Sequence, residues 1–236
     1  MSNDADRCIY ACDIGSTRPT PSRFGWARVT PDKPNEVIGS SDIDKLVECL
    51  KRDLGDGRSI ALGFEAPLFI PVPELASDLS KGRDGDGNRS FAAPAGLTVA
   101  MLAVHQAAWI LREIRRPTSQ PNITFTTDWR SWPPGGTSPI LFCWEAFVVG
   151  EAHSEEHDSK KHVQDAATAA ACFCENECSL EEANAVKKTE RPLSLIGAIA
   201  LWSEWDRDLE ALHRCTLVIK PKRKYAGRLM ILRDLL

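Results

Sequence analysis

CIYACD, residues 8–13, is a short apolar run that ends in an acid, and the turn residues Gly15, Ser16 and Thr17 follow it. Short apolar runs bounded by turn residues are typical of buried strands. We therefore predict a first strand here, with Asp13 at its C-terminal end.

The residues after this run predict a strand meander followed by a helix and a fourth strand. Residues 24–29, FGWARV, and residues 35–39 are predicted to be the second and third strands. Periodic apolar residues then predict a helix from residue 41 to about residue 53. Residues 59–64, SIALGF, predict a buried strand that ends at Glu65.

The rest of the chain alternates between helical and strand patterns. Residues 71–96 are rich in Pro, Gly and charge and predict a long loop, which in a compact domain is usually functional or disordered. The later predicted elements are a helix at 97–114, a strand at 123–127, a strand at 140–149, a helix at 162–174, a helix or helix pair at 192–212 and a strand at 215–219.

This order predicts an α/β fold in which a mixed sheet carries helices on both faces. We expect a single domain over residues 1–236, with its core at roughly 8–175 and an α-rich, helical C-terminal extension at 190–236. The length of 236 residues suits one sizeable core.

Composition points to an ordinary globular protein, with 43% hydrophobic and 26% charged residues. The net charge of −4 argues against a protein that coats nucleic acid non-specifically. We see neither a signal peptide nor a run of about 20 apolar residues that would span a membrane. The eight cysteines are too scattered for a disulfide scaffold, so we expect a cytoplasmic protein.

Four acids interrupt or end apolar segments, namely Asp13, Glu65, Glu145 and Asp165. Burying an isolated carboxylate is costly, so such groups are normally paired, hydrogen-bonded or bound to metal. A single acid at the end of a strand is most often a turn former or a helix cap. Asp13 and Glu65 together favour a functional interpretation more strongly, because both end apolar strands that could lie side by side.

Several short motifs resemble the landmarks of RNase H-like proteins. They read CDIG…FGWA, GFEAPLFIPVP, CWEAFVVG and HVQDAATAAACF, and they occur in the order found in domain-of-unknown-function family 429. The last motif is also similar to the final acid-bearing helix of RuvC-like nucleases. The resemblance covers roughly residues 8–175.

The resemblance implies a divalent-metal-dependent phosphodiester hydrolase or nuclease with Mg²⁺ or Mn²⁺ as cofactor. Asp13, Glu65 and Asp165 would be the metal ligands, and Glu145 would assist as a ligand or base. The family's Gly-x-x-x-Arg element is hard to find, and the interval between Glu145 and Asp165 is short. Arg83 and Arg89, in the long loop, are therefore the candidate substrate-binding residues for phosphate.

Two basic clusters stand out in this acidic chain, and we expect nucleic acid as a partner through such local patches. Their members are Lys187, Lys188 and Arg191 in the first cluster and Lys220, Lys222, Arg223, Lys224 and Arg228 in the second. A charge run is more often a solvated face.

Two alternatives of other classes stay open. The fold could serve as a non-catalytic module that binds a nucleotide or a protein through the 71–96 loop. The sequence Asp13-Ile14-Gly15-Ser16-Thr17 also resembles the first phosphate loop of sugar kinases and related ATPases, which implies an ATP-dependent phosphotransferase. Those proteins normally contain two such halves, and this chain is short for that.

Overall fold

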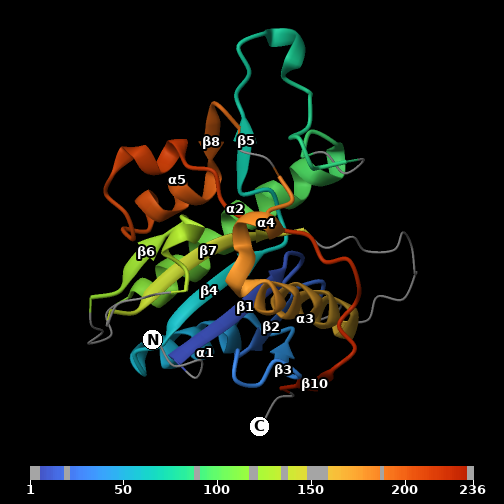
Figure 1. Cartoon of the computed structure of the whole chain (residues 1–236), viewed down its shortest axis with the longest axis vertical. Helices are drawn as coiled ribbons and strands as arrows, with labels where there is room; N and C mark the ends of the chain where they lie inside the picture. Colours follow the sequence, from blue (N-terminus) through green and yellow to red (C-terminus); the bar gives the residue numbers. More distant parts are fainter. Residues whose placement is uncertain are drawn as a thin grey trace.

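A computed structural model describes residues 6–18, 22–87, 91–116, 122–133, 138–147, 159–186 and 189–232 (Figure 1). Within these ranges, eight strands form one mixed sheet in the order β10-β3-β2-β1-β4-β7-β6, with β9 also paired to β7. The strands are β1 (Arg7–Asp13), β2 (Gly25–Val29), β3 (Glu36–Ser40), β4 (Ser59–Phe64), β6 (Thr124–Thr126), β7 (Ile140–Ala146), β9 (Val218–Ile219) and β10 (Arg228–Ile231).

The sheet is antiparallel at β1-β2-β3 and parallel at the remaining pairs. A separate antiparallel pair joins β5 (Phe69–Pro71) to β8 (Pro192–Ser194). The α-helices are α1 (Ile43–Gly55), α2 (Pro94–Arg115), α3 (Ser159–Glu175), α4 (Leu180–Ala183) and α5 (Leu195–Trp202). Short 3₁₀ helices are η2 (Ala76–Asp78), η3 (Trp129–Ser131), η4 (Glu177–Ser179) and η5 (Leu209–His213).

Alternation along β1 divides the core into two layers, one on each face of the sheet. Cys8, Tyr10 and Cys12 point to the face covered by α1, α2 and α5, which we call the α1/α2 face. Ile9 and Ala11 point to the opposite face, which is covered by α3 and which we call the α3 face. Helices therefore cover both faces of a mixed sheet (Figure 1), so the predicted α/β class is confirmed at that level.

Local sequence signals explain the best-predicted elements. The predicted strand at 59–64 is β4 without change, and α1 begins after Asp42 because that side chain caps the helix by accepting from the backbone of Asp44 and Lys45. The loop at 71–96 is shorter than predicted, since Pro94 starts α2 and Phe69–Pro71 is a strand. Pro at the first turn of a helix is favourable because its missing N–H is not needed there.

The C-terminal part of the chain corrects the prediction of a helical extension. Only α5 and η5 are helical within the predicted helix pair, and Pro192–Ser194 is a strand. Strands β9 and β10 join the main sheet, β9 beside β7 and β10 at the edge beside β3. Residues 190–232 therefore belong to the same folded unit as the core.

Helix α2 is, in the described part of the chain, the one helix long and apolar enough by length and composition to cross a membrane. From Ala103 onward it supplies Ala103, Ala107, Ile110, Leu111 and Ile114 to the core on the α1/α2 face. That packing is typical of a core helix in a globular domain.

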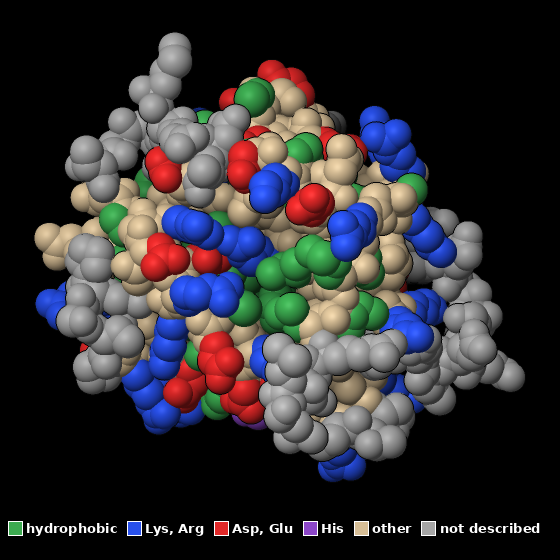
Figure 2. All heavy atoms as spheres, turned by 90° about the horizontal axis from the view of Figure 1, so that it is seen from below, with side chains coloured by type: hydrophobic (Ala, Val, Ile, Leu, Met, Phe, Trp, Pro, Cys, Tyr) green, Lys and Arg blue, Asp and Glu red, His purple; other side chains and the backbone are tan. Residues whose placement is uncertain are grey.

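The face seen from below in Figure 1, where α1, β3 and β10 lie, carries charges of both signs around a hydrophobic area (Figure 2). Met230 and Ile231 of β10 are each 36% exposed. A mixed surface of this kind agrees with a net charge of −4 and is typical of a solvated face.

Candidate functional site

Asp13 and Glu65 lie side by side at the C-terminal edge of two parallel strands. Strand β1 pairs with β4 so that Cys12 is opposite Phe64, and the Glu65 amide donates to the Cys12 carbonyl at 2.8 Å. Glu65 is one of the neighbours that act on the Asp13 carboxyl group, and it lowers the pKa of Asp13. Carboxylates at neighbouring strand ends repel each other when both are ionised, so this edge of the sheet favours a compensating proton or cation.

His162 of α3 is the second partner of Asp13. Its Nδ1 lies 2.6 Å from Asp13 Oδ2, and the two side chains are 25% and 13% exposed. Burial raises the pKa of Asp13, while His162 and Glu65 act in the opposite direction. The hydrogen bond to Asp13 raises the pKa of His162, so the imidazolium form is favoured beside this carboxylate.

Two glycines let α3 approach the sheet closely enough for this contact. A Cβ on Gly25 of β2 would lie 2.3 Å from the backbone carbonyl carbon of His162, and one on Gly39 of β3 would lie 2.7 Å from Val163 Cγ1. Any larger residue would push the helix outward. The position of His162 therefore depends on the small residues of β2 and β3.

Asp165 lies one turn further along α3 than His162 and is half-buried. Burial raises the pKa of Asp165, and the negative charge of Asp13 raises it further. Lys161, His162 and Lys224 oppose this shift. The charge of Asp13 therefore disfavours ionisation of Asp165, and cationic side chains from two segments partly offset this effect.

Asp13, Glu65 and Asp165 thus gather on the α3 face, where the structure adds His162 to them. Within the described ranges, no group of three or more His, Cys, Asp or Glu side chains is arranged closely enough to hold a metal ion. The donor chemistry nevertheless suits a hard divalent cation, which prefers carboxylate oxygens. The His162 imidazole now lies against Asp13, and its pKa is raised by that contact.

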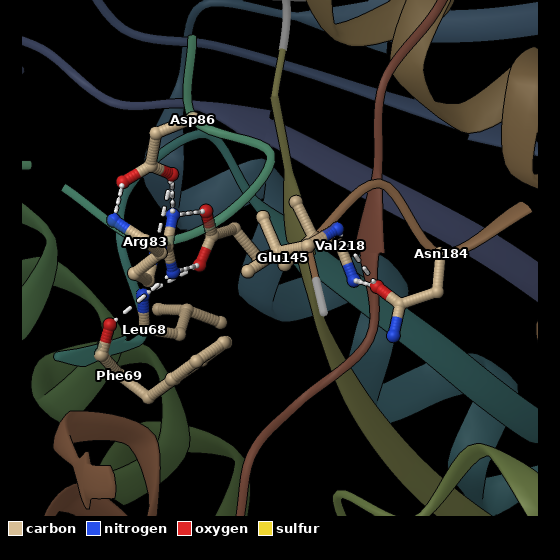
Figure 3. Close-up of polar contacts among 8 residues, drawn as sticks. Leu68, Phe69, Arg83, Asp86, Glu145, Asn184 and Val218 are labelled. Atoms are coloured by element: carbon tan, nitrogen blue, oxygen red, sulfur yellow. Dashed lines mark hydrogen bonds and ion pairs between the residues drawn. The ribbon is translucent and has the colours of Figure 1, made fainter. Parts of the chain in front are cut away.

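Glu145 lies near the end of the neighbouring strand β7, where strand alternation places it on the same face as Leu141 and Cys143, the α1/α2 face. Figure 3 shows its contacts. Its carboxylate accepts from Arg83 Nη2 at 2.6 Å, from Arg83 Nη1 at 2.8 Å and from the Leu68 amide at 2.9 Å. Arg83 also bonds Asp86 through Nε at 3.0 Å and Nη2 at 2.8 Å. The side chains of Arg83 and Glu145 have no exposed surface.

These contacts correct two predictions. Glu145 pairs in register with Phe64 of β4, one position before Glu65, so the strand alternation directs it to the α1/α2 face and away from Asp13. Arg83 is bound by two buried carboxylates and fixes the long loop to the end of β7, so it does not present a free guanidinium for a substrate phosphate. Arg89 lies outside the described residues.

The loop after Asp13 has a packing explanation for its glycine. A Cβ on Gly15 would meet the backbone carbonyl of Arg23, whose amide donates to the Ser16 carbonyl at 2.8 Å. The buried Gln106 side chain donates to the Gly15 carbonyl. These contacts explain the Asp-Ile-Gly-Ser-Thr turn without a bound phosphate, so they do not favour the phosphotransferase alternative.

His162 is the functional candidate that the sequence prediction did not assign to this site. Its one sequence signal is its position three residues before Asp165, which places both on neighbouring turns of a helix. Comparison with known proteins adds no further assignment: no family model, no curated protein and no solved structure matches this chain.

Proposed function

We propose that the chain is a divalent-metal-dependent phosphodiester hydrolase of RNase H-like fold, with its site at Asp13. The observation that carries the proposal is the convergence of Asp13, Glu65 and Asp165 on one face of the sheet, from β1, β4 and α3. Three acids at one position repel each other unless a cation or protons compensate them. Such an arrangement suits a site that exchanges protons for Mg²⁺ or Mn²⁺.

Asp13, Glu65 and Asp165 would hold the metal, and a bound divalent ion would supply Lewis-acid stabilisation of phosphate oxygens and a more acidic water. The chain's own residues then have distinct tasks. His162 orients the Asp13 carboxylate through Nδ1 and holds a proton at that atom. Lys161 and Lys224 limit the build-up of negative charge beside Asp165, which favours approach of an anionic phosphodiester.

The test combines metal binding with cleavage. Wild type should gain thermal stability with Mn²⁺, by about 2.7 kcal/mol at 100 times the dissociation constant, and should cleave labelled nucleic acids or an activated phosphodiester. Asp13→Asn and Asp165→Asn should lose both properties. Asp32→Asn, which changes an exposed acid in the turn before β3, is the matched control and should retain them.

Equal Mn²⁺ stabilisation and equal cleavage in wild type and both site variants would refute the proposal. Retained binding of a nucleotide or a protein without metal binding or cleavage would instead support the non-catalytic module. Thermal stabilisation by ATP that is lost in Asp13→Asn would support the phosphotransferase.

A further inference from the structure

A large groove lies between the second half of α3 and the segment that joins β9 to β10. We call this segment, residues 220–227, the strap; it passes outside α3 in Figure 1. The groove has a volume of about 1160 Å³ and is lined by α3, by residues 176–185 and by the strap. Small-molecule pockets usually measure about 300–1,000 Å³, so the groove offers room for an extended ligand.

The strap is held to α3 by specific hydrogen bonds. Gln164 Nε2 donates to the Tyr225 carbonyl at 2.8 Å, and the Tyr225 amide donates to Thr168 Oγ1 at 3.1 Å. The Tyr225 side chain packs against the core of the α3 face. The wall of the groove is therefore part of the fold, and its side chains project from a fixed backbone.

The lining is basic in a chain of net charge −4. Four of the lining residues are cationic, namely Lys220, Lys222, Arg223 and Lys224, and two are acidic, Glu175 and Glu182. Arg223 pairs with Glu175 at 3.1 Å, but their side chains are 81% and 55% exposed, and surface pairs of this kind contribute little and exchange readily. A local positive excess on an acidic protein indicates an anionic ligand.

The groove begins about one helical turn from Asp165. Thr168 lines it and lies three residues after Asp165, about 4.5 Å along the axis of α3. Lys224 lines it as well, and its charge acts on Asp165. A chain of phosphates bound beside Lys224 would thus lie close to Asp165.

We propose that this groove binds the sugar-phosphate backbone of a nucleic-acid strand and directs it to the Asp13 site. The direction toward the acids rests on the proposed hydrolase function, whereas the binding itself does not. A repeating row of phosphates matches a row of cations on an extended backbone, and contacts to phosphates carry no base specificity.

The test measures binding of labelled single-stranded DNA, single-stranded RNA and duplex by fluorescence anisotropy, with EDTA present so that no cleavage occurs. The groove variant is Lys222→Gln/Arg223→Gln, which leaves Lys224 beside Asp165 in place. The matched control is Arg52→Gln/Arg207→Gln, which removes two exposed cations outside the groove. Thermal unfolding checks that all variants are folded.

In wild type, the logarithm of affinity should fall linearly with the logarithm of salt concentration. The groove variant should bind about tenfold or more weakly at about 0.1 M salt, with a slope shallower by about 1.4 for two lost phosphate contacts to a single strand. The control should match wild type. The three nucleic acids show which form the groove prefers.

Equal weakening in both variants, or no binding of any nucleic acid, would overturn the proposal. Salt-dependent binding of an acidic peptide in place of nucleic acid, lost in the groove variant, would also overturn it and would assign the groove to a protein partner. The groove variant should keep the Mn²⁺ stabilisation of wild type, and Asp13→Asn should bind nucleic acid at least as tightly as wild type. Failure of the groove and failure of the metal site are thus separable.

Discussion

The acids at the ends of β1 and β4 and the acid at the end of β7 lie on opposite faces of one sheet and are compensated differently. On the α1/α2 face, Glu145 is fully buried and receives three hydrogen bonds from Arg83 and the Leu68 amide. On the α3 face, Asp13 is bonded to His162, lies beside another acid, Glu65, at the neighbouring strand end, and is 13% exposed at its side chain. The charge of Glu145 is fully compensated by protein groups, whereas burial raises the pKa of Asp13.

This difference separates a structural acid from a candidate functional one. A buried carboxylate with a bidentate guanidinium has its charge and its lone pairs satisfied. A buried carboxyl group with a raised pKa can change its charge when a ligand binds. Three predictions follow from the comparison, in order of decreasing effect on stability.

Glu145→Ala should be the most damaging substitution at either site. It leaves the fully buried guanidinium of Arg83 with Asp86 as its only described carboxylate partner, and breaking a buried ion pair typically costs about 3–5 kcal/mol. Urea unfolding measures the loss of free energy. Glu48→Ala, on the exposed side of α1, is the control and should change stability by no more than about 0.5 kcal/mol.

A loss below about 1 kcal/mol for Glu145→Ala would contradict this account. It would mean that the long loop opens easily and hydrates Arg83, so that the contact in Figure 3 is not what fixes the loop to the sheet.

Asp53 is a second acid on the α1/α2 face. The Asp53→Asn substitution should lower the free energy of unfolding by about 3 kcal/mol at neutral pH. Asp53 accepts from Tyr10 Oη and from Arg28 Nε at 2.6 Å and Arg58 Nη1 at 3.2 Å. Burial by itself would raise the pKa of Asp53, but the bonds from Arg28 and Tyr10 outweigh it and lower the pKa.

Because the folded pKa of Asp53 is lowered, its contribution is complete above the unfolded pKa of about 3.9 and is lost as the pH falls through the folded value. The difference between wild type and Asp53→Asn should therefore be constant from neutral pH down to about pH 4 and shrink below it. Chemical unfolding across this range measures it. A difference that persists unchanged in strong acid would show that the charge of Asp53 is not what stabilises the fold.

Asp13→Asn should have the smallest effect, within about 1 kcal/mol of wild type at neutral pH or slightly stabilising. Burial raises the pKa of Asp13, so the folded state disfavours its charge, and a neutral side chain of the same shape relieves that cost. The same unfolding assay applies. A loss above about 2 kcal/mol would place the Asp13–His162 pair with the structural ion pairs.

Elements set by interactions between residues close in sequence were predicted well, and those set by contacts between distant segments were not. The strand at 59–64 and the helix after Asp42 were predicted well because apolar runs and caps are local signals. Strand β10 was not predicted, because it is short, lies at an edge and pairs with β3, which is far away in the sequence. Arg83 was assigned to phosphate because nothing in a charged loop shows that one of its arginines folds back onto a buried acid.

The sequence by itself determined that Asp13 and Glu65 end apolar strands, since composition and turn residues mark strand ends. It did not determine the face of Glu145, because strand β7 is buried on both sides and reads as a continuous apolar run with no polar alternation to mark its orientation. Only the tertiary structure decided that Glu145 meets Arg83 and that His162 meets Asp13. The physical reason is that the register of the parallel strands and the close approach of α3 over Gly25 and Gly39 depend on contacts between distant segments.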